Sequence, residues 1–134
     1  MKHIVIVVDD RPGVLADISY LLGKSKINME NVSVEVVGGK GIIHIFLKDD
    51  TKARKILTIN GYNVISPEHI VLRLENKPGE WAKAAGLLKK EKINILNVQL
   101  LTKGRTHHIY SLITDNNKKA EKVLSSYLWL EDVP

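Results

Sequence analysis

Apolar residues switch twice between the spacing of a strand and the spacing of a helix within the first 66 residues. Residues 3–8 form a continuous apolar run, which is typical of a buried strand, and Ile18, Leu21 and Leu22 then follow at helical spacing. Glycines at residues 38, 39 and 41 predict a hairpin between two further strands. The predicted elements are strands at 3–8, 32–36, 42–47 and 62–66, with helices at 14–22 and 49–59.

The second half of the chain repeats the first. Shifted by 66 residues, positions 3–52 align with 69–118 without a gap, and 18 of the 50 pairs are identical. The pattern therefore predicts a second set of elements: strands at 70–75 and 128–133, with helices that include Trp81 to Leu88 and Ala120 to Tyr127. We expect two domains, at residues 1–67 and 68–134, joined only by Pro67 and Glu68.

Each copy has the element order βαββαβ. With right-handed crossovers this order gives an α+β, ferredoxin-like unit, in which a four-stranded antiparallel sheet carries both helices on one face. The second sheet face and the sheet edges then need cover. We therefore expect the copies to pair, and the chain to form a homodimer.

A sharp turn precedes the first helix of each copy, at residues 10–13 and 76–79. With Ile27-Asn28 and Asn31-Val32, the stretch from Asp10 to Leu15 resembles ACT domains, and the resemblance covers both copies. ACT domains are regulatory modules that bind amino acids or other small metabolites at the interface between two units. There, the turn and the start of the second strand line the site. The resemblance therefore implies these ligand-binding residues: Asp10, Arg11, Gly13, Val14, Leu15, Asn28 and Asn31, with Asn76, Lys77, Gly79, Glu80, Trp81, Asn94 and Asn97.

Physical chemistry is consistent with such a site. Unpaired N–H groups at a helix N-terminus suit a carboxylate, and an Asn amide can contact both charged groups of an amino acid. The copies differ where Glu80 and Trp81 replace Val14 and Leu15. The same residues also suit purely structural roles. Asn28 and Asn94 are equally suited to bonding their own backbone, Arg11 and Lys77 suit solvent, and the turns need their glycines in any case.

Composition excludes some other classes of protein. The sequence has no cysteine, which excludes disulfides and thiolate chemistry, and no apolar run approaches the ~20 residues of a membrane span. The net charge is +5, but the lysines are interspersed with acids, which is typical of solvated helix faces. We expect a cytoplasmic protein.

Little in the sequence favours catalysis, a cofactor or a metal. His107 and His108 are neighbours on a strand and point to opposite faces, so they cannot readily chelate one ion. An acylphosphatase-like enzyme would use Arg11 but needs a Gly-rich cradle, and an RNA-binding sheet would have only Phe46 and Tyr110 as rings. We expect a non-enzymatic sensor that regulates a separate enzyme or transcriptional partner. A scaffold without a ligand is the alternative.

Overall fold

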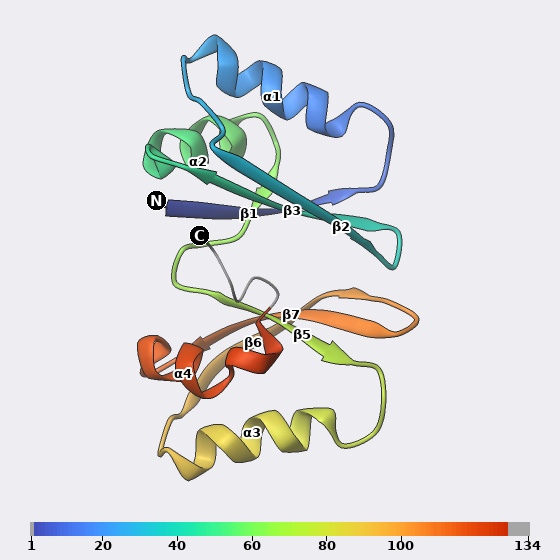
Figure 1. The fold of residues 1–134 in the computed structure, drawn as a ribbon, viewed down its shortest axis with the longest axis vertical. Coiled ribbons are helices and arrows are strands. Elements are labelled where there is room, and N and C mark those ends of the chain that lie inside the picture. The colour runs from blue at the N-terminus through green and yellow to red at the C-terminus, as the bar shows by residue number, and fades with distance from the viewer. Residues whose placement is uncertain (1, 129–134) are drawn as a thin grey trace. The chain divides into compact units, whose positions relative to one another are not determined.

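Two hydrophobic cores divide the chain. The structure is a computed structural model that describes residues 2–128, and the chain separates into the units Met1–Ile65 and Ser66–Pro134 (Figure 1). None of the helices in the described part is long and apolar enough to cross a membrane.

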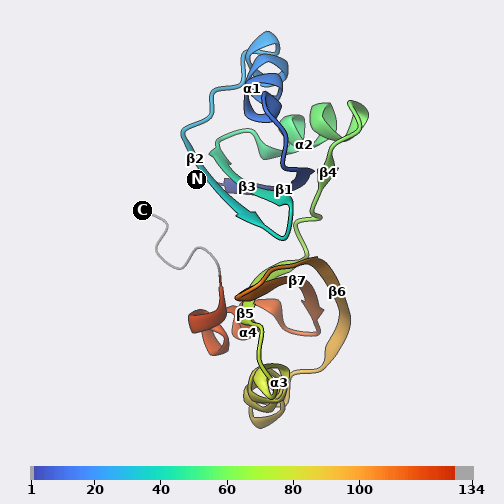
Figure 2. The same ribbon diagram turned by 90° about the vertical axis from the view of Figure 1, so that its right-hand side faces the viewer.

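Unit 1 is a four-stranded antiparallel sheet in the order β2-β3-β1-β4. Both of its helices lie on one face of that sheet (Figure 2), where Ile18, Leu22 and Leu57 pack against isoleucines of β1 and β3. This is the predicted ferredoxin-like arrangement. Its elements are β1 (Lys2–Asp9), α1 (Val14–Lys24), β2 (Asn31–Val37), β3 (Lys40–Leu47), α2 (Asp50–Ile59) and β4 (Asn63–Val64).

Unit 2 repeats the plan with strand order β5-β7-β6. Leu128 forms an antiparallel bridge with Leu72 on β5, and the rest of the strand predicted at 128–133 lies outside the described residues. Ala84 and Leu88 of its first helix pack into the second core. Its elements are β5 (Ile70–Glu75), α3 (Glu80–Lys90), β6 (Ile95–Lys103), β7 (His107–Thr114), α4 (Asn117–Val123) and the 3-10 helix η1 (Ser125–Tyr127).

The ungapped alignment of the two copies is wrong beyond the hairpin. Ile43 lies opposite Ile6 in unit 1, whereas Tyr110 lies opposite Leu72 in unit 2, so equivalent positions are now 67 residues apart. The cause is loop length: two residues separate β2 from β3, and three separate β6 from β7. Since strand side chains alternate between faces, this one-residue shift moves each aligned side chain of β7 to the other face of its sheet.

The same shift changes the roles of polar residues after β3 and β7. Asp49 caps α2 by accepting from the N–H of Lys52, and Asn116 caps α4 by accepting from that of Lys119. Asp49 therefore corresponds to Asn116. It follows that the structural counterpart of Asp115 is Lys48, although the ungapped alignment pairs Asp115 with Asp49.

Candidate ligand-binding site

The first helix of unit 1 begins at an open turn. Gly13 is the N-cap of α1 in a left-handed conformation, with φ of 84°, and no side chain of the described residues caps the helix there. A Cβ added at Gly13 would meet none of their atoms within 4 Å. Arg11 lies 3.6 Å from Asp17 in an exposed ion pair, and the N–H of Asp10 bonds the carbonyl of Gly39 at 3.0 Å. The turn can therefore present helix N–H groups to an anion.

Within the described residues, the corresponding turn of unit 2 also begins its helix at an uncapped glycine, but an acidic side chain follows that glycine. Gly79 has the same conformation, with φ of 86°, but the next residue, Glu80, is 8% exposed. Its Oε1 lies 3.6 Å from Nζ of Lys77 and 3.5 Å from Nζ of Lys83. This carboxylate lies in the first turn of α3, where the helix dipole favours negative charge. A ligand carboxylate would have to compete with it.

Lys77 is held at the same turn. Its Nζ lies 2.9 Å from Glu75, and this hydrogen bond, together with the charge of each partner, raises the pKa of Lys77 and lowers the pKa of Glu75. Lys77 therefore already has two carboxylate partners within unit 2.

The apolar candidates separate into core and surface residues. Val14 is 6% exposed and belongs to the core of unit 1, whereas Leu15 is 39% exposed. Trp81 packs against the second core and meets the Tyr110 ring edge-to-face at 5.1 Å. Among these three candidates, Leu15 is thus the one whose side chain remains largely accessible.

The asparagines after the first helices differ as well. Asn94 is held by Asp115: its N–H lies 3.0 Å from one carboxylate oxygen, and its Nδ2 lies 3.2 Å from the other. Asn28 is exposed, and within residues 2–128 its side chain makes no hydrogen bond. Asn31 accepts from the N–H of Val32 at 2.8 Å, and Asn97 is exposed. Of the two equivalent amides, Asn28 and Asn94, the free one is therefore in unit 1.

A single unit does not bring the two halves of the predicted site together. The turn lies before α1 and Asn28 lies after it, and a helix of 11 residues is about 16 Å long. The strands give the same result. Asp9, beside the turn, pairs with Lys40 at the start of β3, whereas Asn31 pairs with Phe46 near the end of that strand. A ligand that contacts both halves needs two units.

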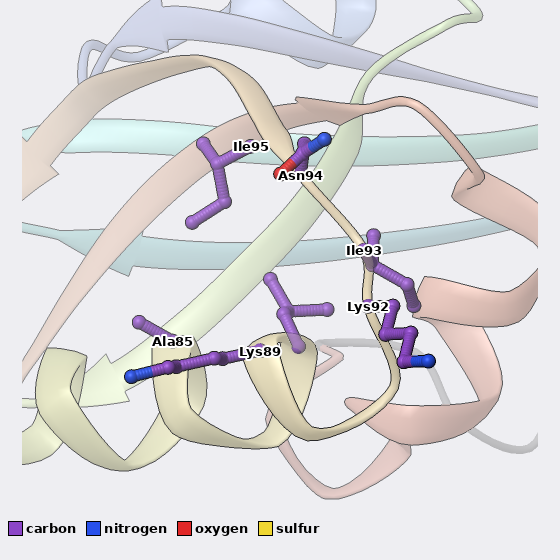
Figure 3. Close-up of a pocket in the computed structure, with 7 residues that line it drawn as sticks. Ala85, Lys89, Lys92, Ile93, Asn94 and Ile95 are labelled. Atoms are coloured by element: carbon purple, nitrogen blue, oxygen red, sulfur yellow. The ribbon is translucent and has the colours of Figure 1, made fainter.

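A groove opens at the Asn94 end of unit 2, between α3 and the start of β6 (Figure 3). Its volume is about 370 Å³, which is within the range of small-molecule sites. Figure 3 shows Ala85 and Lys89 on the helix side and Ile95 on the strand side. The lining is Ala85, Leu88, Lys89, Lys92, Ile93, Asn94 and Ile95. Sequence reasoning missed this groove, because it identified only Asn94 among these residues.

The histidines do not assemble a metal site. His107 pairs with Glu75 and His108 with Leu74, so the two imidazoles lie on opposite faces of the sheet. The ring of His107 contacts the hydroxyl of Thr106 at 3.0 Å. Across residues 2–128, no three His, Cys, Asp or Glu side chains are grouped as metal ligands.

The fold defines a tandem of two ferredoxin-like α+β units, and comparison with known proteins gives its family. The family model described as "ACT domain pair" matches residues 1–130, so the chain belongs to the ACT domain family, as its resemblance predicted. ACT domains are regulatory, so membership supports a ligand-binding regulatory role.

Several solved structures are similar to this chain. A Bacteroides thetaiotaomicron protein is 23% identical with a TM-score of 0.48, covering 92% of this chain and 85% of its own. The regulatory subunit of aspartate kinase from Thermus thermophilus is 15% identical with a TM-score of 0.42, covering 92% and 90%. A putative glycine cleavage system transcriptional repressor is 13% identical with a TM-score of 0.38, covering 92% and 86%. No curated protein matches the chain.

Proposed function

We propose that this protein is a cytoplasmic sensor that binds a small amino acid with an apolar side chain and regulates a separate enzyme or transcriptional partner. One observation carries the proposal. Within the described chain, unit 1 leaves the Asn28 amide unbonded and has Val14 after its turn glycine, whereas unit 2 bonds the equivalent Asn94 to Asp115 and has the carboxylate of Glu80 after Gly79. Because the Asn28 amide is exposed and makes no hydrogen bond within residues 2–128, it is available to a ligand.

The chemistry matches a zwitterion. The N–H groups at the start of α1 would receive the carboxylate, the Asn28 carbonyl would accept from the ammonium, and the exposed Leu15 would contact the side chain. Gly13 lets the backbone approach closely, because no side chain of residues 2–128 lies in front of it.

A homodimer through β2 would complete this site. β2 is an edge strand, and Val34 and Val36 are 49% and 54% exposed. An antiparallel pair of β2 strands centred on Val34 sets valine against valine across the two-fold axis. It also sets the start of one β2 against the end of the other. The Asn28 end of each chain then lies toward the end of the partner sheet that carries the Gly13 turn.

A thermal-shift screen of the twenty amino acids tests the proposal. A true ligand at 100 times its dissociation constant should add ~2.7 kcal/mol to the free energy of unfolding. Asn28→Ala should remove this response without lowering the stability of the free protein, since the Asn28 side chain has no bond to lose within the described residues. Asn94→Ala is the matched control, and it should keep the response. A protein that no amino acid stabilises, or one that responds only while Asn94 is intact, contradicts the proposal and favours a scaffold.

A further inference from the structure

The edge strand of unit 2 carries an exposed apolar surface that the ligand proposal does not use. β6 ends the sheet β5-β7-β6, and between Ile95 and Thr102 it has no charged side chain. Natural edge strands usually carry charges or prolines that block pairing with other chains. We define the β6 surface by its exposed side chains: Ile95 at 38%, Leu96 at 63%, Val98 at 43% and Leu100 at 39%.

Positive charge flanks both ends of the β6 surface. Lys89 and Lys92 line the groove at its start (Figure 3), and Lys103 is the last residue of the strand. The floor of the groove is apolar, because Leu88 and Ile93 are 1% and 5% exposed. A partner that fills this surface therefore needs apolar side chains along the strand and negative charge at an end.

A second copy of the chain does not meet that requirement. Two antiparallel β6 strands centred on Gln99 would set Lys103 of one copy beside Ile95 of the other, at the groove that holds Lys89 and Lys92. Like charges set opposite each other are destabilising. The register of β6 against β7 also shifts between Ile95 and Asn97 and between Leu100 and Thr102, so only a short regular stretch lies between the two irregularities. β2 lacks the second obstacle, since its register against β3 is continuous.

We propose that the β6 surface and its groove bind an extended segment of another protein, with alternating apolar residues along β6 and carboxylates at the end beside Lys89 and Lys92. Main-chain hydrogen bonds to an exposed edge give affinity in such pairings, and side-chain pockets give selectivity. That the segment belongs to the protein regulated by this sensor rests on the proposed function. The binding of such a segment to the β6 surface does not depend on the proposed function.

Fluorescence anisotropy with the full chain tests the charge requirement. One labelled probe is a nine-residue peptide of alternating Val and Thr that begins with two Glu, and its control begins with two Lys. The acidic peptide should bind at least tenfold more tightly at low salt, with the difference shrinking as salt is added. The double variant Lys89→Glu/Lys92→Glu should reverse the preference. Equal binding of both peptides, or of neither, would overturn the proposal.

A matched pair of neutral substitutions tests the location. Val34 and Leu100 are equivalent edge positions, each opposite a helix-facing residue of the neighbouring strand. Leu100→Asn should weaken acidic-peptide binding at least tenfold and leave both the dimer, measured by light scattering, and the amino-acid response intact. Val34→Asn should weaken the dimer and keep peptide binding. Dissociation of the dimer by Leu100→Asn would show that β6 joins two copies. If the protein shows no response to amino acids but still binds the acidic peptide, the sensor proposal fails and the proposal for the β6 surface stands.

Discussion

The two ACT units share a fold and a turn, yet they differ in how equivalent polar groups are bonded. Over residues 2–128, both first helices begin at a glycine without a side-chain cap, but unit 1 leaves the amide of Asn28 open, whereas unit 2 bonds Asn94 to Asp115 and has the carboxylate of Glu80 in the first turn of α3. Under the proposed function, the open amide of unit 1 is the one available to a ligand, whereas that of unit 2 is held by Asp115.

One additional residue in the loop between β6 and β7 explains why Asn94 is bonded and Asn28 is not. The longer loop of unit 2 shifts everything after it by one position, which frees Asp115 from the capping role that Asp49 has in unit 1. Asn116 caps α4 instead, and Asp115 reaches Asn94. At the equivalent position unit 1 has Lys48, which cannot accept a hydrogen bond from an amide.

The largest expected effect comes from exchanging the residues that follow the two turn glycines. Val14→Glu should lower the free energy of unfolding by about 3 kcal/mol or more, because it buries a carboxylate in an apolar core. Three residues after position 14 lies Asp17, whose carboxylate repels the new charge. Three residues after Glu80, by contrast, lies Lys83, whose ammonium attracts the carboxylate. Urea unfolding of Val14→Glu beside the unsubstituted protein measures this.

The reciprocal variant is the control. Glu80→Val should be neutral or stabilising by about 1 kcal/mol, since apolar residues often replace buried ionic ones without loss. If Val14→Glu and Glu80→Val lower the free energy of unfolding by the same amount, unit 2 does not specifically accommodate the carboxylate of Glu80, and the contrast between the turns fails.

A second difference should appear as pH is lowered. Burial, and then the charge of His3, lowers the pKa of His44 from 6.5 to about 3. Because the unfolded chain binds the proton more readily, stability is full above about pH 6.5 and is lost as pH falls toward the folded-state pKa. Between pH 7 and 5 the loss should be about 2 kcal/mol, from the 1.36 kcal/mol that each pKa unit represents.

Denaturant unfolding at pH 7, 6 and 5 measures the slope. His44→Gln should remove most of it, because glutamine does not titrate. The structurally equivalent residue of unit 2 is Ser111, so this part of the pH dependence belongs to unit 1. An unchanged slope in His44→Gln would assign it to different titrating groups.

Sequence periodicity was sufficient for the fold and insufficient for the site. Apolar spacing and the 66-residue repeat predict the element order, because they record which side chains face the core. They do not record loop geometry. An alignment that pairs Ile43 with Ile109 looks sound, although the two side chains face opposite sides of their sheets. The hydrogen bonds of Asn94 and the ion pairs of Glu80 could not be predicted from the sequence, because that register and burial determine their partners.

The smallest expected effect tests whether the Asp115 contact alone decides which unit stays open. Lys48→Asp places a carboxylate in unit 1 where unit 2 has Asp115, so Asn28 should become bonded as Asn94 is. One added hydrogen bond to a charged group at an exposed site should raise the free energy of unfolding by about 0.5–1 kcal/mol. The stabilisation by an amino acid should fall at the same time, because the Asn28 amide is no longer free. Lys48→Ala separates this from loss of the lysine and should keep the response. A Lys48→Asp protein that still responds fully would mean that Asn28 contacts no ligand, and the open turn at Gly13 would then have to account for binding by itself.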